Sequence, residues 1–134
     1  MNKVIYIIKK YPISLCLIAV VIYLSFFKPP SIDMPKFPHY DKLVHFCMYA
    51  AISGMLWIEF LWNHKRYDHV LSHAWIGATL CPIIMGGVIE ILQENCTDYR
   101  GGDWLDFLAN TVGVIAASLI AYYIIRPLFI RQRK

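Results

Sequence analysis

Three separate stretches of the sequence place ionisable and amide side chains next to long apolar runs. These side chains are Asp41, Lys42, His45 and Tyr49 in the first stretch, Glu90 and Gln93 in the second, and Arg100, Asp103, Asp106 and Asn110 in the third. An imidazole beside carboxylates can transfer protons, and lysine and arginine can hold a phosphate or carboxylate group. One histidine with two carboxylates could also hold Mg²⁺ or Mn²⁺ more readily than Zn²⁺. Each of these chemistries requires a fold that brings the three stretches together.

Four apolar blocks are the elements that could position these residues. They cover residues 11–27, 43–62, 72–93 and 104–126, and a helix needs about 20 residues to cross a bilayer. Apolar residues make up 58% of the 134-residue chain and charged residues 16%, whereas a soluble domain carries about 25% charged residues. We therefore expect an all-α, polytopic membrane protein, with residues 1–134 forming a single transmembrane domain that is a four-helix bundle. The composition excludes a disordered chain, a nucleic-acid-binding arm and a small disulfide-stabilised secreted domain.

The distribution of basic residues predicts the orientation of this bundle. Nine Lys and Arg residues lie in the two terminal segments and in the connection between the second and third blocks, and four lie in the other two connections. Because connections rich in Lys and Arg stay in the cytoplasm, both termini are predicted to be cytoplasmic. The first block is expected to be an uncleaved helix, since no small-residue cleavage site follows it.

In this topology the three polar stretches meet at the extracytoplasmic ends of the second, third and fourth helices. Residues four apart share a helix face, which groups His45 with Tyr49 and Asp106 with Asn110. Such side chains are costly in hydrocarbon unless they face the interior of the bundle. We therefore expect a single pocket that opens to the outer leaflet. Its expected lining residues are His45, Glu90, Arg100, Asp106 and Asn110.

Several residues in and around these helices have a structural interpretation. Asp103 lies just before the fourth helix, where an N-cap is expected. Asp106 then lies in the first turn, where a carboxylate interacts favourably with the helix dipole, so its structural and site roles are both open. Small residues are expected to let the helices pack closely; they are Gly54, Gly87, Ala109, Gly113 and Ala117.

The polar stretches resemble the motifs of the VanZ-like family. The run Asp41-Lys42-Leu43-Val44-His45-Phe46 resembles its D-K-x-x-H-F motif, and Glu90-Ile91-Leu92-Gln93 resembles its E-x-x-Q motif. The third stretch, from Arg100 through Asp103, Asp106 and Asn110 to Gly113, is similar to the R…D…D-x-x-x-N-x-x-G ending of the family. The resemblance spans residues 41–117. It implies a small multi-pass protein of the bacterial cytoplasmic (inner) membrane, in a family whose founding member is an accessory protein in resistance to the glycopeptide antibiotic teicoplanin.

Three classes of function are open at this point. In the first, Lys42, His45 and Arg100 bind the headgroup of a membrane lipid or cell-envelope precursor, and a polar network orients them. That network comprises Asp41, Tyr49, Glu90, Gln93, Asp103, Asp106 and Asn110. In the second, a membrane-embedded enzyme acts on a lipid-linked or envelope substrate, with His45, Glu90 and Asp106 as catalytic candidates. In the third, the polar residues stabilise the bundle and the protein is a structural or accessory partner. No metal, cofactor or nucleic-acid partner is expected, and the oligomeric state is open.

Overall fold

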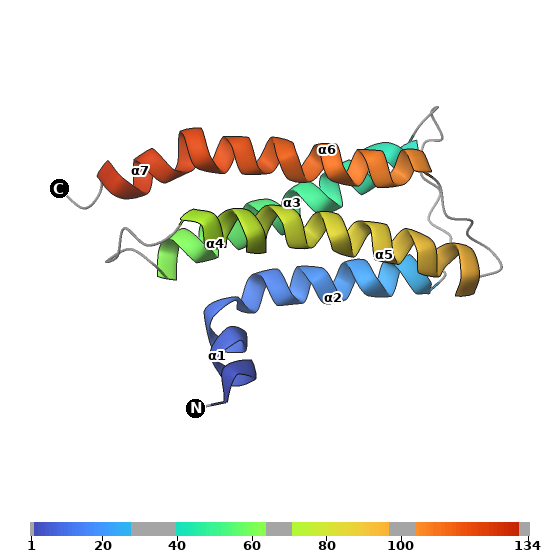
Figure 1. The fold of residues 1–134 in the computed structure, drawn as a ribbon, viewed down its shortest axis with the longest axis horizontal. Helices are drawn as coiled ribbons and strands as arrows, with labels where there is room; N and C mark the ends of the chain where they lie inside the picture. The colour runs from blue at the N-terminus through green and yellow to red at the C-terminus, as the bar shows by residue number, and fades with distance from the viewer. Residues whose placement is uncertain (1, 28–39, 64–70, 97–103, 132–134) are drawn as a thin grey trace.

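The protein is built from helices, and the long ones lie side by side (Figure 1). The computed structural model describes residues 2–27, 40–63, 71–96 and 104–131. In chain order the elements are α1 (Lys3–Lys10), α2 (Pro12–Phe26), α3 (Tyr40–Asn63), α4 (Leu71–Trp75), the π-helical segment η1 (Ile76–Leu80), α5 (Cys81–Cys96), α6 (Trp104–Ile120), the π-helical segment η2 (Ala121–Ile125) and α7 (Arg126–Arg131). No strand occurs within the described ranges, so the all-α prediction is confirmed for them.

Three continuous helical stretches are long and apolar enough to cross a membrane. They are Tyr40–Asn63 with 24 residues, Leu71–Cys96 with 26 and Trp104–Arg131 with 28. At about 1.5 Å per residue, each exceeds a hydrocarbon thickness of about 30 Å. Only 28–39% of the most apolar part of each stretch is buried inside the protein. The remaining apolar surface requires lipid around it, so the chain is a membrane-embedded, multi-pass protein.

The helices extend beyond the apolar blocks that predicted them. The second begins at residue 40 instead of 43, the third ends at residue 96 instead of 93, and the last ends at residue 131 instead of 126. An apolar block stops at the first charge, whereas the backbone hydrogen bonds of a helix continue through polar residues at its ends. The polar residues of the predicted site are therefore on helical turns.

The helix of the first apolar block differs from the other three because a sharp break at Tyr11 precedes it. α1 and α2 meet the criteria of length and hydropathy only as a pair, and they are bent by 94° relative to each other. Pro12 begins α2, at a position where the missing N–H of proline costs no helical hydrogen bond. The described residues thus contain three spans, or four if α1 and α2 together form one bent span.

The end of α3 holds this break in place. Glu59 is buried, and its carboxylate accepts hydrogen bonds from the backbone N–H groups of Ile13 (3.0 Å) and Ser14 (3.1 Å) and from the Ser14 hydroxyl. One turn further, the Asn63 amide donates to the Lys10 carbonyl at the end of α1 (2.6 Å). A carboxylate at a helix N-terminus satisfies free N–H groups and interacts favourably with the helix dipole. We refer to this end of the bundle as the Glu59 end.

Both π-helical segments end two residues before a proline, Pro82 or Pro127. Proline has no N–H to donate to the carbonyl four residues earlier, and a π turn accommodates such a fault in the helix. At the first proline this carbonyl belongs to Ala78, and it accepts a hydrogen bond from Ser53 Oγ of α3 at 2.6 Å. Ser53 Oγ also lies 3.1 Å from Ser118 Oγ of α6. Hydroxyl groups therefore join three helical stretches in the middle of the bundle.

Small residues allow α3 and α6 to form the most extensive contact in the described bundle. A Cβ atom at Gly113 would overlap the backbone carbonyl of Phe46. A Cβ atom at Gly54 would lie 3.9 Å from the Ala117 Cβ, which is an ordinary contact distance. Ala109 is half-buried on α6. The approach at Gly113 fixes the distance between the two helices one turn from the polar residues of the site.

Candidate functional site

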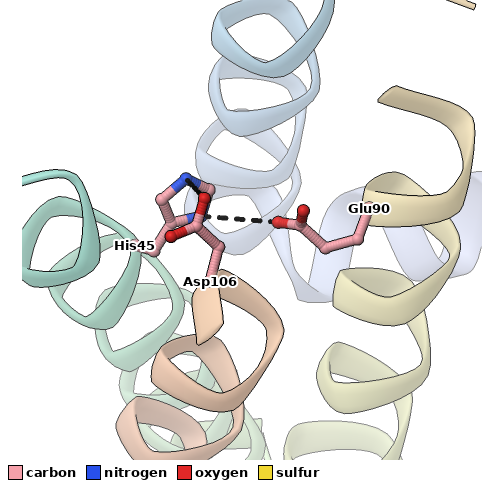
Figure 2. A group of neighbouring side chains, drawn as sticks. All are labelled: His45, Glu90 and Asp106. Carbon is pink, nitrogen blue, oxygen red and sulfur yellow. Dashed lines mark ion pairs between the residues drawn. The ribbon is translucent and has the colours of Figure 1, made fainter. Parts of the chain in front are cut away.

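Three helices bring a histidine and two carboxylates together at the end of the bundle opposite Glu59. His45 lies in the second turn of α3, Glu90 in α5 and Asp106 in the first turn of α6. Figure 2 shows the three side chains pointing toward one another, each from a different helix. We refer to this end of the bundle, where α3 and α6 begin and α5 finishes, as the His45 end.

The imidazole of His45 lies between the two carboxylates. Its Nδ1 is 3.9 Å from Glu90 Oε1 and its Nε2 is 3.7 Å from Asp106 Oδ2 (Figure 2). One nitrogen or oxygen atom from each residue lies within 4.8 Å of the others. The side chains of His45, Glu90 and Asp106 are 5%, 9% and 16% exposed. These separations are too long for hydrogen bonds, so the three groups face one another across short gaps.

Asn110 sets the orientation of the imidazole ring. Its Oδ1 lies 3.1 Å from His45 Nδ1, and because an amide oxygen only accepts hydrogen bonds, the ring nitrogen donates. In the neutral ring, Nε2 then carries the lone pair, and Nε2 is the atom that faces Asp106. A lone pair that faces a carboxylate is repelled unless a proton or a metal cation lies between them.

A second layer of residues lies one helical turn deeper. Tyr49, Gly86 and Asn110 each follow or precede a residue of the first layer by four positions on the same helix. A Cβ atom at Gly86 would come within 3.2 Å of the Tyr49 ring and 3.3 Å of Asn110 Nδ2. At the neighbouring Gly87, a Cβ atom would come within 3.2 Å of the ring of Phe107. Glycine at both positions therefore lets α5 approach α3 and α6.

Two polar side chains in this deeper layer each have a buried atom without a hydrogen-bond partner among the described residues. Tyr49 and Asn110 are each 1% exposed. Tyr49 Oη and Asn110 Nδ2 have no hydrogen-bond partner among the described residues. A buried polar group without a hydrogen-bond partner lowers the free energy of unfolding by about 1–3 kcal/mol. The Glu90 carboxylate is close enough to the Tyr49 phenol for the two to interact electrostatically.

Lys42 contributes a positive charge at the rim of the site. Its Nζ lies 3.9 Å from Asp106 Oδ1, and its side chain is 28% exposed. Lys42 lies one turn before the buried His45 on α3, nearer to the start of the helix. Among the described residues, the cluster therefore combines one lysine with two carboxylates and an imidazole.

The other predicted site residues lie around this cluster or outside the described residues. Gln93 is buried, and its Nε2 donates to the Ser25 carbonyl of α2 at 2.8 Å, so it links α5 to α2. Asp41 is exposed in the first turn of α3. Arg100 and Asp103 lie outside the described residues. The structure thus brings together Lys42, His45, Tyr49, Glu90, Asp106 and Asn110.

Two sets of buried polar residues, Glu59 and the pair Ser53 and Ser118, were not among the residues that the sequence singled out. Glu59 could have been identified because it is a carboxylate inside an apolar block, and because α2 begins without a capping side chain of its own. Ser53 and Ser118 gave no comparable signal, because serine is also common where helices merely pack closely in membranes.

Comparisons with known proteins give one partial similarity. No family model matches the chain, and no solved structure gives a significant match. The chain is 30% identical over 79 residues to a protein of Bacillus subtilis (strain 168) called "Uncharacterized peptidase YgaJ". The matched region covers 59% of this chain and 33% of that relative, so the chain spans about a third of the length of the curated protein that it matches.

Proposed function

We propose that the protein is a VanZ-like, four-span protein of the bacterial cytoplasmic membrane. In this proposal the His45 end lies on the extracytoplasmic side and binds the phosphate or carboxylate headgroup of a membrane lipid or cell-envelope precursor. The observation that carries the proposal is the convergence of His45, Glu90 and Asp106 from three helices into one buried cluster. From the resemblance alone, the proposal extends to an influence on glycopeptide susceptibility in cells.

The proposed topology counts α1 and α2 as one bent span. Four spans place both termini on the same side of the membrane, and α1 and α7 do lie at the same end of the bundle (Figure 1). That is the Glu59 end, and the nine Lys and Arg residues that the sequence places in the terminal segments and in the connection between the second and third apolar blocks favour the cytoplasmic side for it. The His45 end then faces outward.

The headgroup is expected to interact with the basic groups of the cluster. Lys42 is partly exposed at the rim, and Arg100 belongs to the connection between the third and fourth spans. Arginine and lysine bind phosphate and carboxylate groups through charge-assisted hydrogen bonds. His45, held by Asn110, lies below Lys42 on the same helix face, where it can contact a headgroup oxygen.

Lipid retention tests the headgroup proposal. The full chain is purified in mild detergent, and bound lipids are identified by native mass spectrometry for wild type, Lys42→Ala and His45→Ala. His73→Ala is the matched control, because His73 is an exposed histidine of α4 near the other end of the bundle. Wild type and His73→Ala should retain an anionic lipid or precursor that the two site variants lose. Equal retention by folded His45→Ala protein would contradict the proposal.

Cysteine labelling tests the topology separately. Single cysteines at Ser31 and Tyr67 are introduced into a chain whose four native cysteines are replaced by serine. An impermeant reagent added to intact cells should label the first position and not the second. The opposite pattern would place the His45 end in the cytoplasm, which would contradict an envelope-facing site.

One observation favours a second candidate, a membrane-embedded enzyme. The Nε2 lone pair of His45 faces Asp106, and an imidazole held in this way can serve as a general base. The name of the Bacillus subtilis relative describes that protein, two thirds of which lies outside the match, and peptidase activity is not part of this proposal. Conversion of a lipid-linked envelope precursor by wild type, abolished in His45→Gln, would favour the enzyme.

A further inference from the structure

We propose that His45, Glu90 and Asp106 bind one divalent cation of the Mg²⁺ or Mn²⁺ class, and that this cation holds the anionic headgroup. The second half of this inference rests on the proposed headgroup function, whereas the first half stands on the cluster itself. The inference follows from four features of the His45 end: its donor geometry, the tautomer of His45, its charge balance and its buried polar groups.

The donor geometry matches a single ion shared by the three side chains. Their candidate ligand atoms lie within 4.8 Å of one another, and His45 Nε2 and Asp106 Oδ2 are 3.7 Å apart. Ligands of a Mg²⁺ or Zn²⁺ ion, at about 2.0–2.2 Å from the metal, lie roughly 3.0–3.5 Å from each other. To bind one ion, the ligand atoms would therefore move closer together by a fraction of an ångström to about one ångström. Small side-chain rotations can produce such movements.

The tautomer of His45 is the one that a metal ligand requires. A histidine that binds a metal through one nitrogen usually donates its other N–H to a carbonyl or carboxylate oxygen. His45 donates from Nδ1 to the Asn110 amide oxygen (3.1 Å), and Nε2 is left with its lone pair toward Asp106. Asn110 is a positioning residue in this account, because it orients the ligand without touching the ion.

The charge balance of the described side chains shows how a cation would help them to bind an anionic headgroup. Glu90 and Asp106 carry two negative charges, and Lys42 carries one positive charge. These described side chains alone would repel a phosphate group. A divalent cation neutralises both carboxylates and leaves the group with a net positive charge, in a buried setting where such interactions are strong. The ion thereby converts an acidic cluster into a site for an anion.

The buried polar groups supply a second, independent indication of a ligand. Tyr49 Oη and Asn110 Nδ2 are buried one turn below the three donors and have no hydrogen-bond partner among the described residues. Mg²⁺ and Mn²⁺ take six ligands and usually keep waters or bind phosphate oxygens. Oxygens of this kind can accept hydrogen bonds from Tyr49 and Asn110, which would satisfy both groups.

The ligand set favours Mg²⁺ or Mn²⁺ over Zn²⁺ and Ca²⁺. Two carboxylates and one imidazole form a mostly oxygen donor set, whereas protein zinc sites are rich in cysteine and histidine. Calcium normally takes six to eight oxygen ligands. Because Mn²⁺ accepts imidazole nitrogen and is paramagnetic, it is the suitable probe.

Electron paramagnetic resonance with Mn²⁺ tests the cation site. The full chain in detergent is titrated with Mn²⁺, and the loss of the free six-line signal measures binding. Wild type should bind one ion, and Glu90→Gln and Asp106→Asn should each weaken binding by about a hundredfold. Glu94→Gln is the matched control, because Glu94 is an exposed carboxylate one turn beyond Glu90 on α5, and it should bind as wild type does. Equal binding by all four proteins, or no binding by wild type, would overturn the proposal.

A spectroscopic measurement on the unmodified protein guards against variants that fail to fold. Electron–nuclear double resonance should detect one directly coordinated ¹⁴N nucleus on the bound Mn²⁺, from His45. Bound Mn²⁺ without nitrogen coupling would place the ion elsewhere and contradict the site.

Chelation separates the cation proposal from the headgroup proposal. Anionic lipid bound to wild type should be released by EDTA and restored by Mn²⁺. If the lipid stays bound in EDTA, the bridging role of the cation is wrong and the headgroup function survives. If one Mn²⁺ binds and no anionic lipid or precursor is retained under any condition, the headgroup function is wrong and the cation site survives.

Discussion

The two ends of the bundle use buried charge in different ways. At the Glu59 end, one carboxylate accepts two backbone N–H bonds and one hydroxyl bond from the start of α2. At the His45 end, the charged and imidazole groups face one another at 3.7–3.9 Å. Two nearly inaccessible polar atoms, Tyr49 Oη and Asn110 Nδ2, have no hydrogen-bond partner among the described residues.

This difference is the one expected between a structural cluster and the proposed binding site. Buried polar groups that are fully hydrogen-bonded stabilise one arrangement of helices. Buried polar atoms without a hydrogen-bond partner, such as Tyr49 Oη and Asn110 Nδ2, cost free energy in the protein alone, and a ligand can recover that cost. The comparison predicts that substitutions at the Glu59 end reduce stability, whereas substitutions at the His45 end mainly reduce binding.

The largest loss of stability is expected for Glu59→Gln. The amide would turn its NH₂ group toward the N–H group of either Ile13 or Ser14, which now donate to separate oxygens of one carboxylate. Loss of a charged acceptor for buried donors should lower the free energy of unfolding by about 2–4 kcal/mol. Unfolding in mixed micelles, with Glu94→Gln as the control, measures this change. A loss no greater than that of the control would mean that Glu59 does not hold α2.

The next largest effect is expected for Gly113→Ala. The new methyl group would meet the Phe46 carbonyl, so α3 and α6 must separate, at a cost of about 1–3 kcal/mol. Gly54→Ala is the matched control at the same interface, because its methyl group fits at 3.9 Å from Ala117. Thermal unfolding should separate the two variants, and equal melting temperatures would mean that α3 and α6 are not packed as described.

A smaller effect is expected for Ser53→Ala in the middle of the bundle. This change removes the donor to the Ala78 carbonyl, which has lost its usual helical donor to Pro82. Interhelical hydrogen bonds in membranes contribute about 0.6 kcal/mol on average, so the loss should be about 1 kcal/mol. Unfolding in mixed micelles measures it, and a loss as large as that of Glu59→Gln would contradict the ranking.

The smallest effect on stability is expected for Asp106→Asn. This change removes a favourable charge from the first turn of α6, and it also removes the repulsion between two carboxylates that lie within a few ångströms of each other. The two effects oppose each other, so the free energy of unfolding without added metal should change by less than about 1 kcal/mol. A large destabilisation would indicate that the His45 end is a structural cluster like the Glu59 end.

The sequence predicted the helices and the meeting of the polar stretches for a simple physical reason. The length of an apolar run indicates a membrane-spanning helix. Because successive helices cross the membrane in opposite directions, the start of α3, the end of α5 and the start of α6 lie at the same side of the membrane. The 94° angle between α1 and α2 was not predicted, because it depends on hydrogen bonds with the end of α3. Similarly, the pairing of His45 with Asn110 depends on how α3 and α6 rotate against each other, which Gly113 and Phe46 determine.

The effect of Mn²⁺ on the thermal unfolding of wild type, Glu59→Gln and Glu90→Gln separates a structural Glu59 end from a cation-binding His45 end. An ion that binds only the folded protein stabilises it by mass action. Mn²⁺ at a concentration that saturates wild type should raise the melting temperatures of wild type and of the less stable Glu59→Gln by about 5 °C or more, and should raise that of Glu90→Gln far less. Equal shifts in all three proteins, or a shift that Glu59→Gln loses and Glu90→Gln keeps, would contradict the division of the molecule into a structural end and a binding end.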